Sequence, residues 1–380
     1  MVKVVGMEKG YKILGNYIRL VDERNKNLAV TKLLGVSISK KFIPSIANIV
    51  GTDLSNYKIV RTGQFAYGPV TSRNGEKISI AYLDEEDCII SSSYTVFEVE
   101  NKEELDPEYL MLWFSRPEFD RYARYKSHGS VREIFDWNEL CMVELPVPDI
   151  EKQRKIVKAY KTITDRIDLK QKINDNLETT LNAVYKELFT IASPDELPYG
   201  WKIAPFSEIA SITMGQSPEG DDCNTSGFGK ALLNGPTEFG FYSPSPVQWT
   251  TNVKKHCVEG DLLFCVRGST TGRMNWANQP YAIGRGLAAI HHKTNHNLNW
   301  FIKAMIDNSL QEILAAATGS TFPNVGKDLL NGFKVIIPDD TTLQKFGSKG
   351  YAISRLITAN AKEIDKLLVF QKTLLSKLTI

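Results

Sequence analysis

Two long stretches of the chain carry apolar residues at the spacing of one helical face, with charged and polar residues between them. The first stretch contains Ile156, Ile163, Ile167, Leu177, Leu181, Val184 and Leu188. The second contains Ile353, Ile357, Ile364, Leu367, Leu368, Leu374, Leu375 and Leu378. Each pattern predicts a helix of about 40 residues, far longer than the usual 11 or 12. Because neither helix can bury its apolar face alone, we expect the two to pack as an antiparallel coiled coil.

Two polar residues, Asn174 and Gln371, interrupt these apolar stripes. A polar group in a seam between helices can fix the register of the pair at some cost in stability. A solvated helix face explains the same two residues equally well, so the pattern leaves both interpretations open.

The chain contains an internal repeat. Gly129-Ser130 recurs as Gly319-Ser320, and Pro148-Asp149 recurs as Pro338-Asp339, both at a separation of 190 residues. The aspartate of each Pro-Asp pair is placed to cap the long helix that follows it. The two halves of the chain are therefore expected to share one design.

Each half begins with a module of mixed structure. Short β-rich runs alternate with Gly, Asn and Ser turns, as in Lys77–Tyr82, Ser93–Val99 and Asp261–Val266. Helical patterns cover Pro107–Tyr125 and Leu298–Ala316. The expected fold class is α+β, with two tandem α/β domains, an internal pseudo-two-fold repeat and two long separating helices. We predict a first domain over residues 1–148, a helix over 149–192, a second domain over 193–338 and a helix over 339–380.

The composition is that of a folded, soluble protein, with 42% hydrophobic and 24% charged residues and a mean hydropathy of -0.22. No apolar run approaches the roughly eighteen residues of a membrane helix, and Met1–Val5 does not resemble the start of a signal peptide. We therefore expect a cytoplasmic protein with no membrane partner. The net charge is only +2, so any binding of nucleic acid must come from local basic patches.

The chain lacks the motifs of several catalytic classes. It has no phosphate loop ending in Lys and Ser or Thr, no GxGxxG, no GxSxG, and no Asn/Asp-Pro-Pro-Phe/Tyr turn of an adenine methyltransferase. Gly268–Arg273 only loosely resembles a phosphate loop and is better explained as a turn between strands. The five cysteines form no CxxC pair, so we expect reduced thiols.

Two clusters remain as candidates for chemistry. His291, His292 and His296 lie close together in the sequence, but a polar loop explains them better than a metal site does, so no metal is predicted. The acidic run Asp84–Asp87 keeps open the alternative of a stand-alone DNA nuclease or hydrolase, although a solvated acidic turn explains it better.

Both domains contain residues suited to contacting DNA. Arginine reads guanine with two hydrogen bonds, Asn and Gln read adenine, and hydroxyl groups hold phosphates. The predicted DNA-binding residues are Arg61, Tyr67, Ser72, Arg73, Asn74, Lys126, Ser130 and Arg132 in the first domain, and Arg267, Ser269, Thr270, Thr271, Arg273, Arg285, Ser320, Thr321, Phe322 and Asn324 in the second.

Several of these segments carry a family resemblance. Gly319–Val325, followed by Lys327–Leu330 and Val335–Pro338, resembles the end of a target recognition domain in the specificity subunits of type I restriction-modification enzymes. Leu197–Lys202 is similar to the opening of such a domain. The resemblance covers nearly the whole chain, although the first half lacks the Thr-Phe-Pro-Asn run and Thr341–Gln344 replaces the usual acidic-Gln start of the second helix.

The resemblance implies a chain that is not an enzyme itself. It implies two target recognition domains that direct adenine-N6 methylation by two modification subunits and ATP-dependent restriction by two restriction subunits. S-adenosylmethionine, ATP and Mg²⁺ would all be bound by those partners, and none by this chain.

The length of the helices adds a geometric expectation. A helix of about 40 residues spans about 60 Å, which corresponds to at most roughly 17 base pairs of DNA. We therefore expect a bipartite double-stranded target with a gap, and an asymmetric one because the two domains differ in sequence. A coiled-coil assembly adaptor that reads no sequence is a further alternative.

Overall fold

The computed structural model describes residues 10–46, 51–72, 74–129, 132–191, 196–319 and 322–379. The chain divides into two compact units. Unit 1 combines Met1–Ile167 with Leu367–Ile380, and unit 2 consists of Asp168–Lys366. Each unit therefore takes in one mixed domain together with a segment of each long helix.

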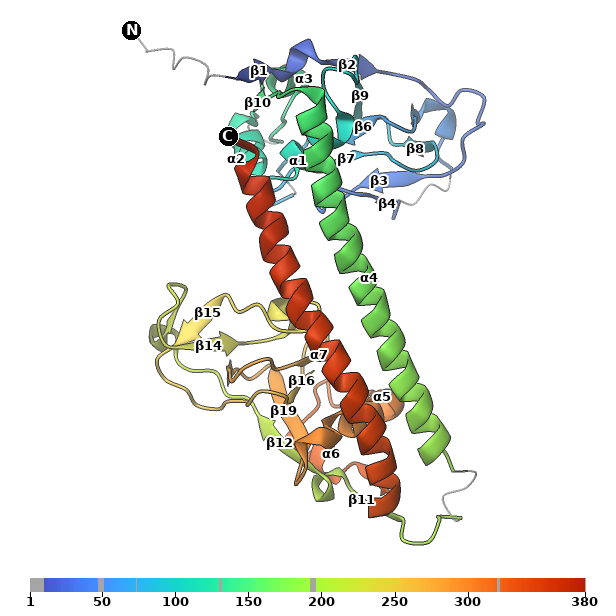
Figure 1. Cartoon of the computed structure of the whole chain (residues 1–380), viewed down its shortest axis with the longest axis vertical. Helices are drawn as coiled ribbons and strands as arrows, with labels where there is room; N and C mark the ends of the chain where they lie inside the picture. Colours follow the sequence, from blue (N-terminus) through green and yellow to red (C-terminus); the bar gives the residue numbers. More distant parts are fainter. Residues whose placement is uncertain are drawn as a thin grey trace. The chain divides into compact units, whose positions relative to one another are not determined.

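Unit 1 contains ten short strands and three short helices among its described residues (Figure 1). They are β1 (Tyr11–Ile13), β2 (Ile18–Val21), β3 (Leu34–Val36), β4 (Phe42–Pro44), β5 (Lys58–Val60), β6 (Phe65–Tyr67), β7 (Ile80–Tyr82), β8 (Cys88–Ile90), β9 (Thr95–Val99), α1 (Pro107–Phe114), α2 (Pro117–Lys126), α3 (Trp137–Cys141) and β10 (Glu144–Pro146).

Unit 2 repeats this mixture of short strands and helices. Its elements are β11 (Lys202–Pro205), β12 (Ala210–Met214), β13 (Cys223–Asn224), β14 (Lys230–Leu233), β15 (Gln248–Thr250), β16 (Leu262–Cys265), β17 (Met274–Trp276), β18 (Ala282–Ile283), β19 (Leu287–His292), α5 (Asn299–Ala315), α6 (Lys327–Gly332) and β20 (Lys334–Ile337). The long helices are α4 (Ile150–Phe189) and α7 (Asp340–Ser376).

The central sheets of the two units have the same topology. The strand order is β2-β9-β6-β7 in unit 1 and β12-β19-β16-β17 in unit 2, and all neighbouring strands are antiparallel. In each unit the buried face of this sheet packs against helices, as where Phe65 and Phe97 stack at 4.9 Å beneath Phe114 of α1. The internal repeat predicted from the sequence is therefore a repeat of architecture, and the α+β fold class is confirmed.

Each domain also closes on itself. The ribbon β1-β10 joins the start and the end of the first domain, and β11-β20 does the same in the second, both as antiparallel pairs. The smaller sheets differ: unit 1 has the two-stranded sheets β3-β4 and β5-β8, whereas unit 2 has the four-stranded sheet β13-β15-β14-β18. The domains thus share a frame and differ in the sheets added to it.

One helix prediction was wrong. The pattern over Pro107–Tyr125 predicts a single helix, but the structure has two, with Ser115 ending α1 and Arg116 standing before α2. Pro117 has no backbone N–H and its ring excludes a preceding helical turn, so it ends one helix and occupies the first position of the next. The buried Arg116 then stacks over Trp113, with its guanidinium carbon 4.2 Å from the ring centroid.

Both long helices start at the predicted aspartates. The Asp149 carboxylate accepts a hydrogen bond from the Lys152 N–H at 2.8 Å. Asp339 accepts from the N–H and the hydroxyl of Thr342 and from the indole N–H of Trp201. The hydrogen bonds from Thr342 lower the pKa of Asp339 to about 2. The stabilisation that the charged Asp339 cap gives to α7 is therefore fully present above the ordinary carboxyl pKa. It is lost only as the pH falls through about 2.

The segments of α4 and α7 in each unit pack against each other, and polar seam residues lock the contact. In unit 2, Asn174 is fully buried and its side chain bonds to the Ile357 carbonyl and to the Asn360 amide. In unit 1, the Gln371 amide donates to the Thr164 hydroxyl at 2.8 Å. The seam interpretation of Asn174 and Gln371 is thus confirmed over the solvated-face interpretation.

Aromatic side chains attach the second domain to the helices of its own unit. Phe301 of α5 is fully buried among Tyr185 and Phe189 of α4 and Phe346 of α7, at ring-centroid distances of 5.7, 5.0 and 5.8 Å. Three helices therefore meet at one cluster. Within the described ranges, no helix has both the length and the apolar composition to cross a membrane.

Candidate nucleic-acid interface

One loop occurs in equivalent form in both domains. His128 and Ile134 exchange two backbone hydrogen bonds of 3.0 and 2.8 Å, and Thr318 and Asn324 exchange two of 3.2 and 2.6 Å. These loops, over residues 128–134 and 318–324, are called the paired loops below. In each, backbone pairing joins the two ends of the segment.

A glycine shapes each of the paired loops. Gly129 has a φ of 132° and Gly319 a φ of 120°, values that favour glycine. A Cβ atom at these positions would lie 2.1 Å from the Arg132 carbonyl oxygen and 2.2 Å from the Phe322 carbonyl oxygen. The recurring glycine of the sequence repeat is thus a backbone requirement at both positions.

A second loop lies beside each paired loop. In unit 1, the Thr71 N–H donates to the Glu133 carbonyl at 2.9 Å. In unit 2, the Thr271 hydroxyl bonds to the Pro323 carbonyl at 2.9 Å and to the Gly268 carbonyl at 2.8 Å. Residues 268–273 connect β16 to β17, so the prediction of a turn between strands is confirmed.

The first domain has an open groove next to its paired loop, with a volume of about 290 Å³. Its lining residues are Val36, Gly68, Pro69, Val70, Asn74, Ser79, Ser93, Tyr94 and Arg132. Two predicted DNA-binding residues, Asn74 and Arg132, therefore come together in one groove. The Asn74 side chain is oriented by a 3.2 Å hydrogen bond to the Val70 carbonyl. This groove is called the first groove.

The second domain has a groove of about 360 Å³, called the second groove. It is lined by Ser217, Pro218, Gly220, Cys223, Asn224, Thr225, Leu232, Asn234 and Gln248. Arg285 adjoins it, because its backbone N–H donates to the Ser217 hydroxyl at 3.2 Å. Asn234 and Gln248 were missed from the sequence, since only the pairing of β14 with β15 brings these distant residues together.

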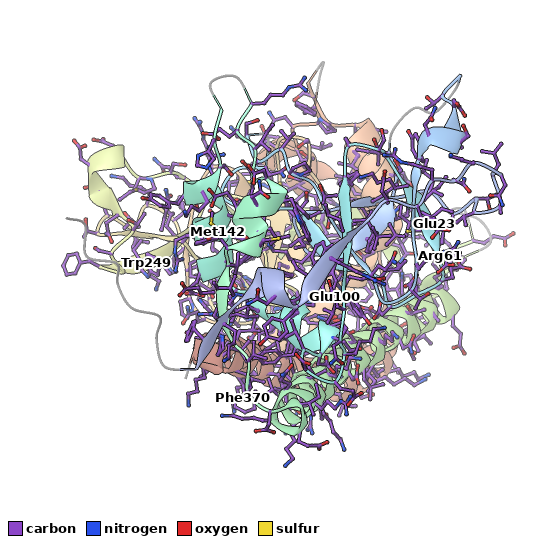
Figure 2. The ribbon with its side chains drawn as sticks, turned by 90° about the horizontal axis from the view of Figure 1, so that it is seen from above. Glu23, Arg61, Glu100, Met142, Trp249 and Phe370 are labelled. Atoms are coloured by element: carbon purple, nitrogen blue, oxygen red, sulfur yellow. The ribbon has the colours of Figure 1, made fainter. Side chains whose placement is uncertain are left out.

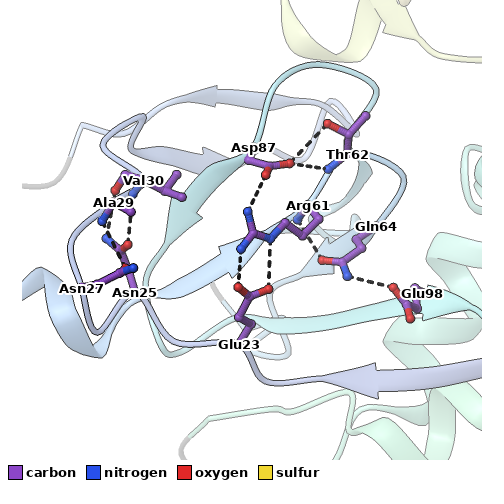
Figure 3. Close-up of polar contacts among 10 residues, drawn as sticks. All are labelled: Glu23, Asn25, Asn27, Ala29, Val30, Arg61, Thr62, Gln64, Asp87 and Glu98. Carbon is purple, nitrogen blue, oxygen red and sulfur yellow. Dashed lines mark hydrogen bonds and ion pairs between the residues drawn. The ribbon is translucent and has the colours of Figure 1, made fainter.

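The Arg61 side chain forms ion pairs with carboxylates of the first domain. Glu23 and Arg61 lie side by side (Figure 2), and the guanidinium bonds to both oxygens of Glu23 and, at 2.7 Å, to Asp87 (Figure 3). The Arg61 backbone N–H donates to Gln64, whose amide donates to Glu98 at 2.8 Å. These carboxylates bond the donors that would contact DNA, so we expect Arg61 to lie outside the interface.

Two further predicted residues are poorly placed for DNA. Tyr67 has 0% exposed surface, and its ring packs edge-on against Phe97 and Phe135 in the core. A ring without exposed surface cannot reach DNA while the domain is folded, so Tyr67 is a core residue. Lys126 is half-buried and its ammonium lies 3.4 Å from the Glu139 carboxylate.

The remaining predicted residues are accessible. Arg132, Arg267, Arg273 and Arg285 are exposed, and none forms an ion pair with another described residue. Ser72, Ser269, Phe322 and Asn324 are exposed as well, and Thr270 and Thr271 are half-buried. Arg73, Ser130, Ser320 and Thr321 lie outside the described residues.

Replacing Arg61 with methionine should lower the stability of the first domain by roughly 0–1 kcal/mol, because exposed ion pairs contribute little. It should leave DNA specificity unchanged, because the guanidinium is held by Glu23 and Asp87. Urea unfolding and sequencing of the target motif would measure the two effects. A changed motif would return Arg61 to the interface.

The clusters considered for catalysis have structural partners. Glu85 and Glu86 each lie 3.0 Å from the Lys32 ammonium, so much of the acidic run is engaged in ion pairs. His291 and His292 belong to strand β19, which corrects the expectation of a polar loop. Their location follows from the pairing of β19 with β12 and β16. The described residues contain no group of three His, Cys, Asp or Glu placed to hold a metal ion.

Comparisons with known proteins point in one direction. A profile of the family described as "Type I restriction modification DNA specificity domain" matches residues 37–179. A Methanocaldococcus jannaschii protein assigned as the MjaX specificity subunit of a type I restriction enzyme is 23% identical over 365 residues, covering 92% of this chain and 85% of that protein. The MjaIX specificity subunit of the same organism is 24% identical over 309 residues, covering 71% and 68%.

A solved structure shares the fold. The S subunit of a type I restriction-modification system from M. genitalium is 14% identical and matches with a TM-score of 0.57 over 97% of this chain and 96% of that one. The matched domain and the relatives aligned along most of the chain show that this protein is similar to the specificity subunits of type I restriction-modification enzymes.

Proposed function

We propose that this chain binds a bipartite, asymmetric double-stranded DNA target, with the first groove reading one half-site and the second groove reading the other. The observation that carries the proposal is the repeated arrangement in each unit: a paired loop, exposed arginines without an ion pair to a described residue, and an adjacent groove. The two predicted domains, residues 1–148 and 193–338, would be the target recognition domains.

The accessible residues have the chemistry for both kinds of DNA contact. Arg132 at the first groove and Arg285 at the second are free to read guanine with two hydrogen bonds. Arg267 and Arg273 flank the turn of Thr270 and Thr271, a combination suited to phosphate oxygens. Phosphate contacts hold the register on the duplex, and groove residues select the sequence.

The target should be asymmetric because the two grooves differ. The first contains Tyr94 and Asn74, whereas the second is walled by Asn234 and Gln248. The forty residues of α4 correspond to about 60 Å of helix. That length supports half-sites separated by no more than roughly 17 base pairs, and hence a gapped target.

The chain would contribute only the recognition of the DNA sequence. Two modification subunits would bring S-adenosylmethionine and methylate adenine N6, and two restriction subunits would bring ATP, Mg²⁺ and cleavage, all in the cytoplasm. Exposed apolar residues of α7 in unit 1 offer a docking surface for the modification subunits: Val369 is 68% exposed and Phe370, labelled in Figure 2, is 57% exposed.

Exchanging residues 1–148 for the corresponding domain of another specificity subunit should change one half of the methylated motif and leave the other half intact. The reason is that each half-site would be read by a single groove. Sequencing of methylated adenines in a host carrying the exchanged chain is the measurement. If both halves changed, the assignment of one domain to one half-site would be wrong.

Two simpler assays separate the alternative functions. Incubating the pure chain with duplex DNA and Mg²⁺ should give no cleavage, whereas a nuclease would cut. Titrating salt during binding to random and to selected duplexes should leave a preference for the selected ones. A pure assembly adaptor would show no such preference at any salt concentration.

A further inference from the structure

The second groove contains a pair of amide side chains on one face of a small sheet. Gln248 of β15 lies directly across from Leu232 of β14, and antiparallel partners share a face. Asn234 follows β14 by one residue, and all three side chains line the groove. Gln248 and Asn234 are thus both available to a ligand that enters the second groove.

The hydrogen bond between the two amides leaves Gln248 with one complete reading edge. The Asn234 amide donates to the Gln248 carbonyl oxygen at 2.8 Å. Gln248 keeps its own two N–H donors and one lone pair on its oxygen. In the major groove, adenine offers the N7 acceptor beside the N6 donor, which a donor-acceptor amide edge matches with two hydrogen bonds. Guanine offers two acceptors there and cytosine a donor.

Close backbone packing holds Asn234 in place. A Cβ atom at Gly284 would lie 2.4 Å from the Asn234 side-chain oxygen, and one at Gly286 would lie 2.2 Å from its backbone oxygen. Only glycine fits at both positions without displacing Asn234. The glycine-rich segment around Arg285 therefore forms a wall against which the amide pair is fixed.

The connection between the two amides is anchored as well, inside unit 2. The Tyr242 hydroxyl donates to Asp175 of α4 at 3.1 Å, and the Ser243 hydroxyl donates to Asp365 of α7 at 3.1 Å. The later part of the β14–β15 connection is thus tied to both long helices before DNA arrives. A side chain fixed in advance loses less freedom on binding, which favours selective recognition.

The rim of the groove carries negative charge. Glu219 and Asp221 are exposed next to Gly220, and Asp222 is bonded to Asn252 at 2.7 Å. Carboxylates repel phosphate oxygens, whereas the exocyclic amino groups of bases are donors that suit an acidic rim. These carboxylates disfavour phosphate contacts on that side of the groove and leave base edges as the better partners there.

We infer that Gln248 reads an adenine of the half-site bound by unit 2 and that Asn234 is the residue that positions it. This inference rests on the proposed function and adds to it a base identity and two residues. Gln248 makes the contact with the base, and Asn234 acts through Gln248 by fixing which edge of its amide faces the DNA.

The test uses the full chain assembled with its modification subunits, and its readout is the methylated motif. Gln248→Glu removes the donor and leaves only acceptors, which suit the N4 amino group of cytosine. We expect methylation of targets with adenine at one position to fall on the order of ten- to hundredfold, with cytosine becoming preferred there. All other positions of the motif should stay unchanged.

A positioning role for Asn234 has its own signature. Asn234→Asp cannot donate to the Gln248 oxygen, so the same single position should lose its preference while the rest of the half-site is retained. Gln311→Glu makes the identical chemical change on the exposed side of α5 and should leave the motif as it is.

The outcomes separate the two claims. An unchanged motif in both groove variants, together with a successful domain exchange, would overturn the reading of adenine by Gln248 but leave the proposed function standing. A domain exchange that alters neither half-site would overturn the proposed function itself. If Gln248→Glu fails to assemble, Gln248→Leu tests the same prediction, since it removes both hydrogen bonds and should make the position degenerate.

Discussion

Replacing Phe301 with alanine should lower the free energy of unfolding of unit 2 by about 3–5 kcal/mol. Phe301 has no exposed surface and contacts rings from both long helices. Its removal would leave a cavity bounded by α4, α5 and α7, and three separate elements cannot all move to fill it. Urea unfolding of the full chain, with hydrogen exchange to locate the transition in unit 2, is the measurement.

A matched control is available in the same unit. Phe241 is 68% exposed, so Phe241→Ala should change stability by much less than 1 kcal/mol. Equal effects of the two substitutions would contradict the assignment of Phe301 as the residue that joins the second domain to its helices.

Replacing Gly319 with alanine should remove recognition of one half-site while leaving the unit folded. The new Cβ atom would lie 2.2 Å from the Phe322 carbonyl oxygen, and φ would have to stay near 120°. Backbone strain of this kind costs about 1–3 kcal/mol, and the loop can avoid it by changing shape. We expect methylation at the full target to be lost or to become indifferent to the half-site of unit 2.

Gly332→Ala is the control for this loop. Gly332 lies at the end of α6, has no neighbouring atom within 4 Å of an added Cβ and does not have a positive φ. It should retain the motif. Retention of the motif by Gly319→Ala, at normal methylation rates, would show that the shape of the paired loop is irrelevant to recognition.

The sequence predicts the frame of this protein well because the frame depends on periodic patterns. The stripes around Ile163 and Ile357 place the long helices, and the 190-residue repeat of Gly129-Ser130 anticipates the paired loops. Such features follow from local spacing alone. The break at Pro117 was missed because the apolar pattern continues across it, although proline itself carries the signal.

The composition of the site is harder to predict because it depends on tertiary partners. Arg61 and Arg132 are indistinguishable in sequence, but the first meets Glu23 and Asp87 and the second lies exposed at a groove. Burial of Tyr67 follows from its position on a central strand. No sequence pattern marks Gln248 as a site residue, since its proximity to Asn234 arises only from strand pairing.

The ribbons β1-β10 and β11-β20 have an evolutionary consequence. Because the two ends of each domain are hydrogen-bonded neighbours, a foreign domain can be inserted through two adjacent junctions, provided that it keeps the buried side chains that pack against α4 and α7. Genetic exchange between related genes would then produce, in one event, a functional protein with a new DNA target sequence. Diversity of targets in such a lineage should grow by shuffling intact cassettes faster than by accumulating single substitutions.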